Sequence, residues 1–484
     1  MFFVLYAVIT VLLAAAVFCA SFWAPATFGE VWADQILFQI RVPLKGADLG
    51  LVRSFALRCL LPAACAGAGA GAGAVWVCHN LSGPAAVLPA LLPLALAALA
   101  LMFFARRFGL AAYARAALTE NTFIADHYCL PPAGEPLFPP RRRNLLYIFL
   151  ESMESSFAGP DEGGALPGNV IPELTALAAL GVNFSHTGGL GGAAAVRQTG
   201  WTVAGMCAQH AALPLNVPFG AKVHGAGQPF LPGALALGDV LAAAGYNQTL
   251  LLGSDAAYSG RRNFYTGHGG FRVLDVRAAA AAGLIPPDYR VRWGFEDEKL
   301  YAYAKQELRR LAEAEAPFHL TMLTVDTHTP GGYLCARCPN LWPRRYLNVL
   351  ACADRQIGDF IRWVQAQDFA ADTTIVVAGD HLSMEPSLEK IIDKNYQRTV
   401  FNVFLGSAVP AQNHKNRLFT MFDLLPTTLA ALGARLTDER LGLGVNLFAG
   451  IPTLLETHGL EALNRGMIGH SAYYRQKLFS AASP

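Results

Sequence analysis

The chain has 484 residues, of which 53% are hydrophobic and only 15% are charged. This balance is too apolar for an ordinary soluble enzyme or a disordered chain, so part of the protein is expected to lie in lipid. The 37 lysines and arginines nearly balance the 35 aspartates and glutamates, and a net charge of +2 predicts no nucleic-acid partner.

Three uncharged runs are long enough to span a bilayer, which takes about 20 apolar residues. They cover residues 1–29, 59–79 and 80–105, and they predict a transmembrane region of about three helices over residues 1–105. The first run lacks the cationic start of a signal peptide and its apolar core is too long, so we interpret it as a retained anchor. The alternating Ala-Gly stretch 66–74 predicts close helix contacts, with lipid-facing filler as the alternative.

The orientation of these spans is left open by charge alone. Arg106 and Arg107 follow the third run, while the loop 78–84 carries no lysine or arginine. Residues 106–143 are predicted to hold a juxtamembrane helix, within the helical pattern 105–129, followed by a Pro-rich linker. This linker marks the boundary with the rest of the chain.

From residue 144 onward, short apolar runs alternate with amphipathic stretches. Strands separated by helices form a largely parallel sheet with helices on both faces, so residues 144–484 are predicted to be one α/β domain. In such sheets, ligands bind at the carboxyl ends of the strands. The predicted strands are 145–150, 249–252, 319–325, 374–378 and 400–405, and the predicted helices are 234–244, 297–312, 347–367 and 421–432.

Acidic residues and histidines directly follow three of these strands. Glu151 follows the first, the segment 326–328 with His328 follows another, and Asp380 and His381 follow a third. Two carboxylates and an imidazole are a suitable ligand set for a divalent ion such as Zn²⁺ or Mn²⁺. Taken singly, Glu151 is better interpreted as an ordinary strand-end carboxylate and Asp380 as a turn residue, and the segment 326–328 is as readily a turn with a surface histidine. Their shared edge of the sheet favours a site. His328 could contact a phosphate oxygen or pass a proton to a leaving group.

A glycine-rich stretch, residues 188–202, contains two threonines near a predicted helix start, Thr199 and Thr202. Backbone N–H groups at a helix N-terminus favour a bound anion. A threonine hydroxyl activated by a metal ion at that point would be a nucleophile. Glycine-rich loops are common, so this stretch by itself is weak evidence for an anion-binding site.

Together these segments resemble the membrane-anchored phosphoglycerol transferases of the alkaline phosphatase and sulfatase superfamily, which act in lipoteichoic acid synthesis and in the decoration of periplasmic glucans. The resemblance implies an alkaline phosphatase/sulfatase-like α/β fold. It also implies one divalent metal ion, with Mn²⁺ preferred over Zn²⁺ or Mg²⁺, bound by Glu151, Thr202, Asp380 and His381. The matching segments, in the family's order, are residues 145–151, 199–206, 326–328, 380–382, 423–427 and 441–448.

The same resemblance implies the roles of further residues. Thr202 corresponds to the nucleophile, and Thr199, one helical turn earlier, is the second choice. His328 corresponds to a histidine that contacts the phosphoglycerol group. The implied substrate-binding residues in the segment 253–265 are Asp255 and either Arg261 or Arg262.

Two departures from the family pattern concern the substrate pocket and the reaction type. The family's tryptophan near that arginine falls on Ser259 or Gly260, so the shape of the glycerol pocket differs. The chain contains no Cys-x-Pro-x-Arg or Ser-x-Pro-x-Arg segment, so the sulfatase route through formylglycine has no candidate residue.

The implied reaction transfers phosphoglycerol from phosphatidylglycerol to a glycan or glycerol hydroxyl through a phosphothreonine intermediate. Because this chemistry needs a lipid donor and no ATP, we expect a multi-pass protein of the inner membrane with its catalytic domain in the periplasm and its amino terminus inside. The alternatives are a phosphoethanolamine transferase, a phosphodiesterase or sulfuric ester-type hydrolase on the same site, and a catalytically silent lipid or glycan sensor.

The cysteines allow a second kind of site. Cys335 and Cys338 have the spacing of half a zinc site, but no second Cys pair completes it. In an oxidising compartment, a disulfide among Cys335, Cys338 and Cys352 is expected instead. The sequence does not determine which pair forms.

Overall fold

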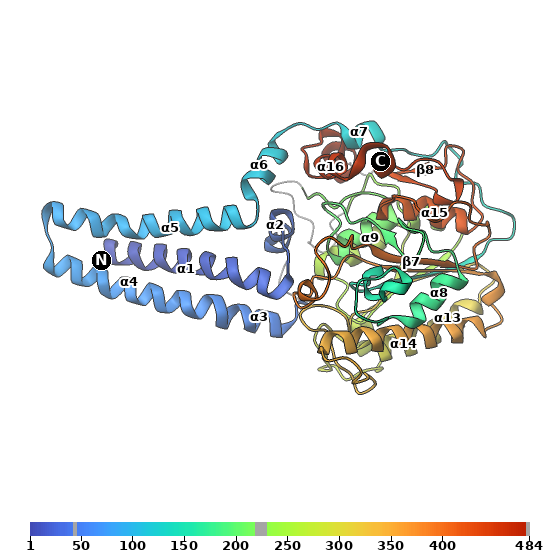
Figure 1. The fold of residues 1–484 in the computed structure, drawn as a ribbon, viewed down its shortest axis with the longest axis horizontal. Helices are drawn as coiled ribbons and strands as arrows, with labels where there is room; N and C mark the ends of the chain where they lie inside the picture. The colour runs from blue at the N-terminus through green and yellow to red at the C-terminus, as the bar shows by residue number, and fades with distance from the viewer. Residues whose placement is uncertain (42–45, 218–229, 481–484) are drawn as a thin grey trace. The chain divides into compact units, whose positions relative to one another are not determined.

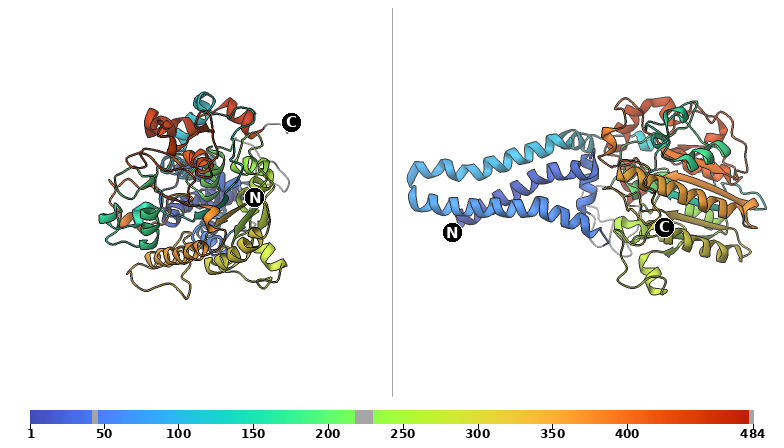
Figure 2. Two further views of the ribbon diagram at one scale, coloured as in Figure 1. Left: turned by 90° about the vertical axis from the view of Figure 1, so that its right-hand side faces the viewer. Right: turned by 60° about the horizontal axis from the view of Figure 1, so that its bottom comes forward.

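The computed structural model describes residues 1–41, 46–217 and 230–480 and divides the chain into two compact units. The first unit comprises Met1–Leu37 and Ala47–Arg115, and the second comprises Phe38–Gly46 and Ala116–Pro484. The first unit consists of helices, the long ones of which run alongside one another in the right-hand view of Figure 2, and the second unit contains the β-sheet.

Three helices of the first unit are long and apolar enough to cross a membrane. The second one starts at Leu49, well before the uncharged run 59–79. Its first part carries Arg53 and Arg58, which ended the uncharged run in the sequence, and their long side chains can extend toward polar surroundings. The third starts at Val87 rather than residue 80, after a break at Gly83, whose φ is 61°. The three helices are α1 (Phe2–Phe28), the continuous α3 (Leu49–Phe55), π-helical Ala56–Leu60 and α4 (Leu61–Asn80), and α5 (Val87–Arg107).

The predicted helix contacts involve alternate glycines of the Ala-Gly stretch. A Cβ added to Gly67 would lie 3.1 Å from Leu12 Cβ, and one added to Gly71 would lie 2.8 Å from Val8 Cγ2. These two glycines therefore face α1 and allow it to pack closely against α4. Gly69 has open space around its Cβ position and faces away from α1.

The helical pattern 105–129 is interrupted in the structure. α6 (Leu110–Leu118) ends before Glu120, and α7 (Phe123–His127) begins after Asn121. Glu120 forms an isolated bridge with His470, and the Asn121 N–H donates to the His470 carbonyl at 2.8 Å. The prediction of one helix there is wrong, because tertiary pairing uses backbone groups that a continuous helix would need.

The second unit is built on a seven-stranded sheet in the order β2-β7-β6-β1-β5-β3-β4. The pairs among β6, β1, β5, β3 and β4 are parallel, and β7 runs antiparallel to both of its neighbours. The strands are β1 (Asn144–Leu150), β2 (Gly192–Ala193), β3 (Asn247–Leu252), β4 (Arg272–Leu274), β5 (Phe318–Leu323), β6 (Thr373–Gly379) and β7 (Val400–Leu405). All five predicted strands are confirmed.

Helices cover both faces of this sheet, and β1 shows why. Its side chains alternate between two buried cores, with Tyr147 in one and Ile148 in the other, so both faces of the strand are apolar. The two helical layers lie on opposite sides of the strands (Figure 1). One contains α8 (Pro172–Leu180), α13 (Asp297–Ala312) and α14 (Arg345–Gln365), and the other contains α9 (Thr202–Ala211), α10 (Leu237–Ala243), α15 (Leu424–Ala431) and α16 (Leu454–Ile468).

The remaining elements are short. They are α2 (Ala33–Arg41), α11 (Arg261–Gly267), α12 (Val276–Ala281) and the two-stranded sheet of β8 (Arg440–Leu441) and β9 (Gly444–Val445). The α/β fold with a largely parallel sheet is as predicted, and β1 lies at the centre of that sheet.

Candidate functional site

Two neighbouring strands place the predicted metal ligands side by side. The register pairs Leu150 of β1 with Gly379 of β6, so Glu151 and Asp380, which follow these residues, leave the sheet at the same edge. The Ser152 N–H links the two strand ends by donating to Asp380 Oδ1 at 2.7 Å. Both carboxylates are buried, with Glu151 2% exposed and Asp380 fully enclosed.

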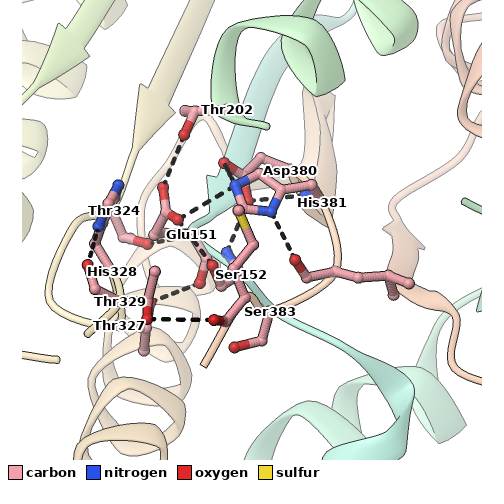
Figure 3. A network of polar contacts seen from close by, with 12 residues as sticks. Glu151, Ser152, Thr202, Thr324, Thr327, His328, Thr329, Asp380, His381 and Ser383 are labelled. Carbon is pink, nitrogen blue, oxygen red and sulfur yellow. Dashed lines mark hydrogen bonds and ion pairs between the residues drawn. The ribbon is translucent and has the colours of Figure 1, made fainter. Parts of the chain in front are cut away.

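The side chains at this edge fit a divalent cation. Glu151, Asp380 and His381 each direct one ligand atom into a space where all three atoms lie within 4.8 Å of one another. The His381 Nε2 atom is 3.4 Å from Glu151 Oε1 and 3.4 Å from Asp380 Oδ2 (Figure 3). Asp380 Oδ2 is buried and has no hydrogen-bond partner among the described residues, which a bound cation would supply.

The tautomer of His381 also suits metal binding. Its Nδ1 lies 2.7 Å from the Leu382 carbonyl oxygen, which accepts a hydrogen bond from Nδ1–H and leaves the Nε2 lone pair for an ion. An imidazole held by its far nitrogen in this way is the usual arrangement of metal-binding histidines.

The electrostatics of the two carboxylates also favour a bound cation. Burial, reinforced by the charge of Glu151, raises the pKa of Asp380. Burial would also raise the pKa of Glu151, but the imidazoles of His328 and His381 outweigh it and lower that pKa. Two carboxylates this close do not both ionise readily without a positive charge between them, and a divalent ion would provide it.

Thr202 points toward this ligand set. It is half-buried at the first turn of α9, and its hydroxyl donates to Glu151 Oε2 at 3.3 Å (Figure 3). Thr199 is fully buried, and its hydroxyl donates instead to the Val196 carbonyl at 2.7 Å. Of the two threonines considered from the sequence, Thr202 is the one that the structure brings to the carboxylates.

Gly205 allows α9 to approach the segment after β6 closely. A Cβ added to Gly205 would lie 1.8 Å from the Asp380 carbonyl oxygen, a distance that no side chain can tolerate. Gly379 is confined in the same way, since its Cβ would lie 2.0 Å from the Met153 carbonyl oxygen. The contacts of α9 and the β1 loop with the β6 end therefore depend on residues without side chains.

The structure distinguishes the two candidate arginines. Arg262 donates from Nη2 to the buried Asp275 carboxylate at 2.6 Å and is committed to that ion pair. Arg261 is buried and donates to the backbone carbonyl oxygens of Asp255, at 3.0 Å, and Tyr258. Burial lowers the pKa of Arg261, while the negative charge of Glu151 acts in the opposite direction, so the guanidinium lies within electrostatic reach of the carboxylates.

Asp255 already has a cationic partner. Its Oδ2 accepts a hydrogen bond from Arg277 Nε at 2.8 Å, and its Oδ1 accepts one from the Ala257 N–H at 2.9 Å. The carboxylate is buried, so this pair fixes the start of the loop that leads to Arg261. In this arrangement Asp255 shapes the loop around the arginine.

His328 lies on the loop after β5 and contacts an aromatic residue that sequence reasoning missed. The Trp293 ring stacks at a tilt on the His328 ring, with centroids 4.7 Å apart, and it also contacts Tyr258 at 5.3 Å. Trp293 is buried, and its Nε1 has no hydrogen-bond partner within the described part of the chain. A tryptophan is thus present beside His328 although Ser259 and Gly260 occupy the family's position.

A second missed residue, Glu154, holds the loop that carries the β6 ligands. Its Oε1 accepts the Ser383 N–H at 2.6 Å, and its carboxylate pairs with the Arg398 guanidinium. Arg398 also donates to the Ser383 carbonyl oxygen at 2.7 Å. This buried pair ties the segment after His381 to the segment after Glu151, and its only sequence signal was a second glutamate close to the first.

Comparison with known proteins places the chain in one family. The sulfatase family model matches residues 143–434 of the chain. Phosphoglycerol transferase I of Salmonella choleraesuis (strain SC-B67) is 32% identical over 318 residues, which cover 64% of this chain and 40% of that relative. The chain thus spans about 40% of the length of the curated relatives that it matches.

Solved structures agree at the level of the fold. The lipoteichoic acid synthase LtaP from Listeria monocytogenes superposes with a TM-score of 0.51 at 16% identity, over 68% of this chain and 81% of that one. The integral membrane lipooligosaccharide phosphoethanolamine transferase A (EptA) from Neisseria meningitidis has a TM-score of 0.50 at 15% identity, over 88% of this chain and 83% of that one.

Proposed function

The chain belongs to the sulfatase family, and we propose that it is a membrane-anchored transferase that moves phosphoglycerol from phosphatidylglycerol to a hydroxyl of a glycan or a glycerol-containing acceptor. The observation that carries this proposal is the Thr202 hydroxyl, held 3.3 Å from Glu151 beside the buried ligand set of Asp380 and His381. The likeness to phosphoglycerol transferase I supports the choice of donor.

The site residues have two proposed tasks, metal binding and substrate binding. Glu151, Asp380, His381 and the Thr202 hydroxyl would hold one divalent ion, with Mn²⁺ preferred over Zn²⁺ or Mg²⁺, and that ion would lower the pKa of the hydroxyl and neutralise phosphate charge. Arg261 and His328 would contact the phosphoglycerol group, with Asp255 positioning the arginine loop. Arg262 is left out of the contact set because it is paired with Asp275.

The proposed reaction has two displacements at phosphorus. In the first, the bond from Thr202 Oγ1 to phosphorus forms while the bond from phosphorus to the diacylglycerol oxygen breaks, and the threonine proton is balanced by the proton gained by diacylglycerol. In the second, the bond from the acceptor oxygen to phosphorus forms while the bond from phosphorus to Thr202 Oγ1 breaks, and the proton lost by the acceptor hydroxyl balances the proton regained by Thr202. Burial lowers the pKa of His328 while the charge of Glu151 acts in the opposite direction, and we propose this histidine, which can both gain and lose a proton, as the proton carrier.

The proposed location follows from the donor. The three long apolar helices would make the protein a multi-pass protein of the inner membrane, in contact with the bilayer that contains its lipid donor. We place the amino terminus inside and the catalytic domain in the periplasm, where a transfer that uses no ATP can proceed.

The test is mass spectrometry of the full chain, purified in detergent and incubated with phosphatidylglycerol and Mn²⁺. The proposal predicts a phosphoglycerol adduct on the peptide that contains Thr202. The Thr202→Ala variant should carry no adduct, whereas the matched Thr199→Ala variant should retain it, because the Thr199 hydroxyl is bonded to Val196. An adduct only with phosphatidylethanolamine would reassign the donor. Release of glycerol phosphate without transfer would indicate a hydrolase, and no turnover of either lipid would favour a silent sensor.

Metal content tests the ligand assignment separately. Asp380→Asn removes the charge of the carboxylate whose buried Oδ2 accepts no hydrogen bond from the described residues, so bound Mn²⁺ should fall by at least about tenfold. Elemental analysis of the purified variant measures this loss. A normal Mn²⁺ content would remove Asp380 from the ligand set without touching the assignment of Thr202.

A further inference from the structure

Three cysteines outside the proposed catalytic site converge beside α14. Cys335 and Cys338 lie in the loop that precedes this helix, and Cys352 lies on the helix itself. The sulfur of Cys335 is 3.5 Å from that of Cys338 and 3.6 Å from that of Cys352, and all three sulfurs lie within 4.8 Å of one another. Cys352 and Cys335 are buried, while Cys338 is half-buried.

The expected disulfide is replaced by three free thiols. A disulfide joins two sulfurs at about 2.05 Å and leaves a third sulfur without a role. By contrast, a tetrahedral Zn²⁺ ion with bonds of about 2.3 Å to sulfur places its sulfur ligands about 3.8 Å from one another. The separations of 3.5 and 3.6 Å are close to that second spacing, and the Cys338 and Cys352 sulfurs lie within 4.8 Å of each other.

A side-chain hydrogen-bond donor from α14 contacts the cluster. The Gln356 Nε2 donates to Cys352 Sγ at 3.5 Å. The Cys338 N–H donates to the Cys335 carbonyl oxygen at 3.1 Å and closes the turn that holds these two cysteines together. A donor such as Gln356 stabilises the negatively charged form of the Cys352 sulfur, which is the form that binds a metal.

We propose that Cys335, Cys338 and Cys352 form a binding site for one Zn²⁺ ion, with a solvent molecule in the fourth position. On binding, the three thiols release three protons to solvent and three zinc–sulfur bonds form, with no change of oxidation state. Three thiolates and a divalent ion carry one net negative charge, and Arg355 of α14 supplies a positive charge near Cys352. Sulfur ligands select zinc over the oxygen-preferring Mn²⁺ and Mg²⁺, so the two metal sites have different preferences.

The position of the cluster gives this ion a structural task. The loop between His328 and Cys335 is held by the Tyr333 N–H, which donates to the Asp326 carbonyl at 2.6 Å, and by Arg292, which donates to the Gly332 carbonyl at 2.8 Å. Zinc would join the far end of this loop to α14 and so restrain the loop that carries His328. It touches no reacting group and acts through the position of that histidine.

The first experiment counts zinc. The full chain is purified in detergent under anaerobic conditions without chelators, and the zinc content is measured by elemental analysis. We expect one zinc per chain that is lost in Cys338→Ser and in Cys352→Ser but kept in Asp380→Asn. The matched control is Cys129→Ser, because Cys129 lies outside the cluster, and it should keep the zinc. A zinc content that falls in Asp380→Asn and is unchanged in both cysteine variants would overturn the proposal.

The second experiment needs no substitution and therefore no assumption about folding. After zinc is removed with a chelator, the wild-type chain is titrated with Co²⁺, and a strong sulfur-to-cobalt charge-transfer band is expected at one equivalent. Counting the free thiols with an alkylating reagent would detect a disulfide in the cluster. If two of the three cysteines resist alkylation until a reductant is added and no band appears, the cluster contains a disulfide and the zinc site is refuted.

Discussion

The two sides of the candidate site are built in different ways. Glu151 and Asp380 lie one residue beyond two paired strands, and the register of β1 and β6 fixes their separation. The proposed substrate side comes from loops, with Arg261 after β3 and His328 after β5. The strand register therefore determines the geometry of the metal side. The substrate side depends on loops, which vary more in sequence, and here a loop places Trp293 beside His328.

The largest expected effect comes from replacing Thr202, which lies beside the metal ligands and is the proposed nucleophile. Thr202→Ala should lower phosphoglycerol transfer by at least about 1000-fold, because it removes the proposed nucleophile while leaving α9 in place. Transfer is measured with a labelled phosphatidylglycerol, and folding is checked by thermal unfolding. Activity within about tenfold of the wild type would exclude a covalent threonine intermediate.

The substrate side offers a matched pair of substitutions. Arg261→Ala should lower kcat/KM by about 100-fold, because a guanidinium that stabilises phosphate charge is lost. Arg262→Ala should change kcat/KM by less than about threefold, since that side chain pairs with Asp275. Steady-state kinetics of both variants decide between them, and a larger effect at Arg262 would reverse the assignment of the two arginines.

The metal side should instead be sensitive to added volume. Gly205→Ala would place a methyl group 1.8 Å from the Asp380 carbonyl oxygen, so α9 must shift, and overpacking of this kind costs about 1–3 kcal/mol. Gly267→Ala is the control, because nothing lies within 4 Å of its Cβ position. Chemical unfolding should show a loss of stability in the first variant that exceeds the loss in the second.

The smallest effect concerns His268, a histidine that belongs to neither the metal side nor the substrate side. Burial would lower the pKa of His268, but its hydrogen bond of 2.7 Å to Asp239 outweighs burial and raises that pKa. The ion pair therefore stabilises the fold fully below the unfolded pKa of about 6.5 and loses that effect as the pH rises through the higher folded value. His268→Gln should cost about 1 kcal/mol at pH 6 and less at pH 9, as measured by denaturant unfolding. An equal cost at both pH values would show that the charge contributes nothing.

The same contrast explains what the sequence could predict. The apolar runs that became β1, β3, β5, β6 and β7 are long and buried on both faces, and Glu151 and Asp380 were recognisable because they follow such runs. β2 has two residues and β4 three, too few for any periodicity to be visible. Trp293 lies in an irregular segment, and its contact with His328 depends on tertiary folding alone. Likewise, Cys352 meets the other cysteines only because of how α14 packs.

The central place of β1 in the sheet also determines when the site can exist. Ser152 and Asp380 are separated by 228 positions in the chain yet are joined by a hydrogen bond. As the polypeptide emerges during synthesis, Glu151 is present long before β6, so the ligand set is incomplete until β6 pairs with β1. An ion that binds only the completed set adds its binding free energy to the finished sheet and to no earlier stage. Occupancy by the ion would therefore report that the chain has been made through His381 and has paired β6 with β1.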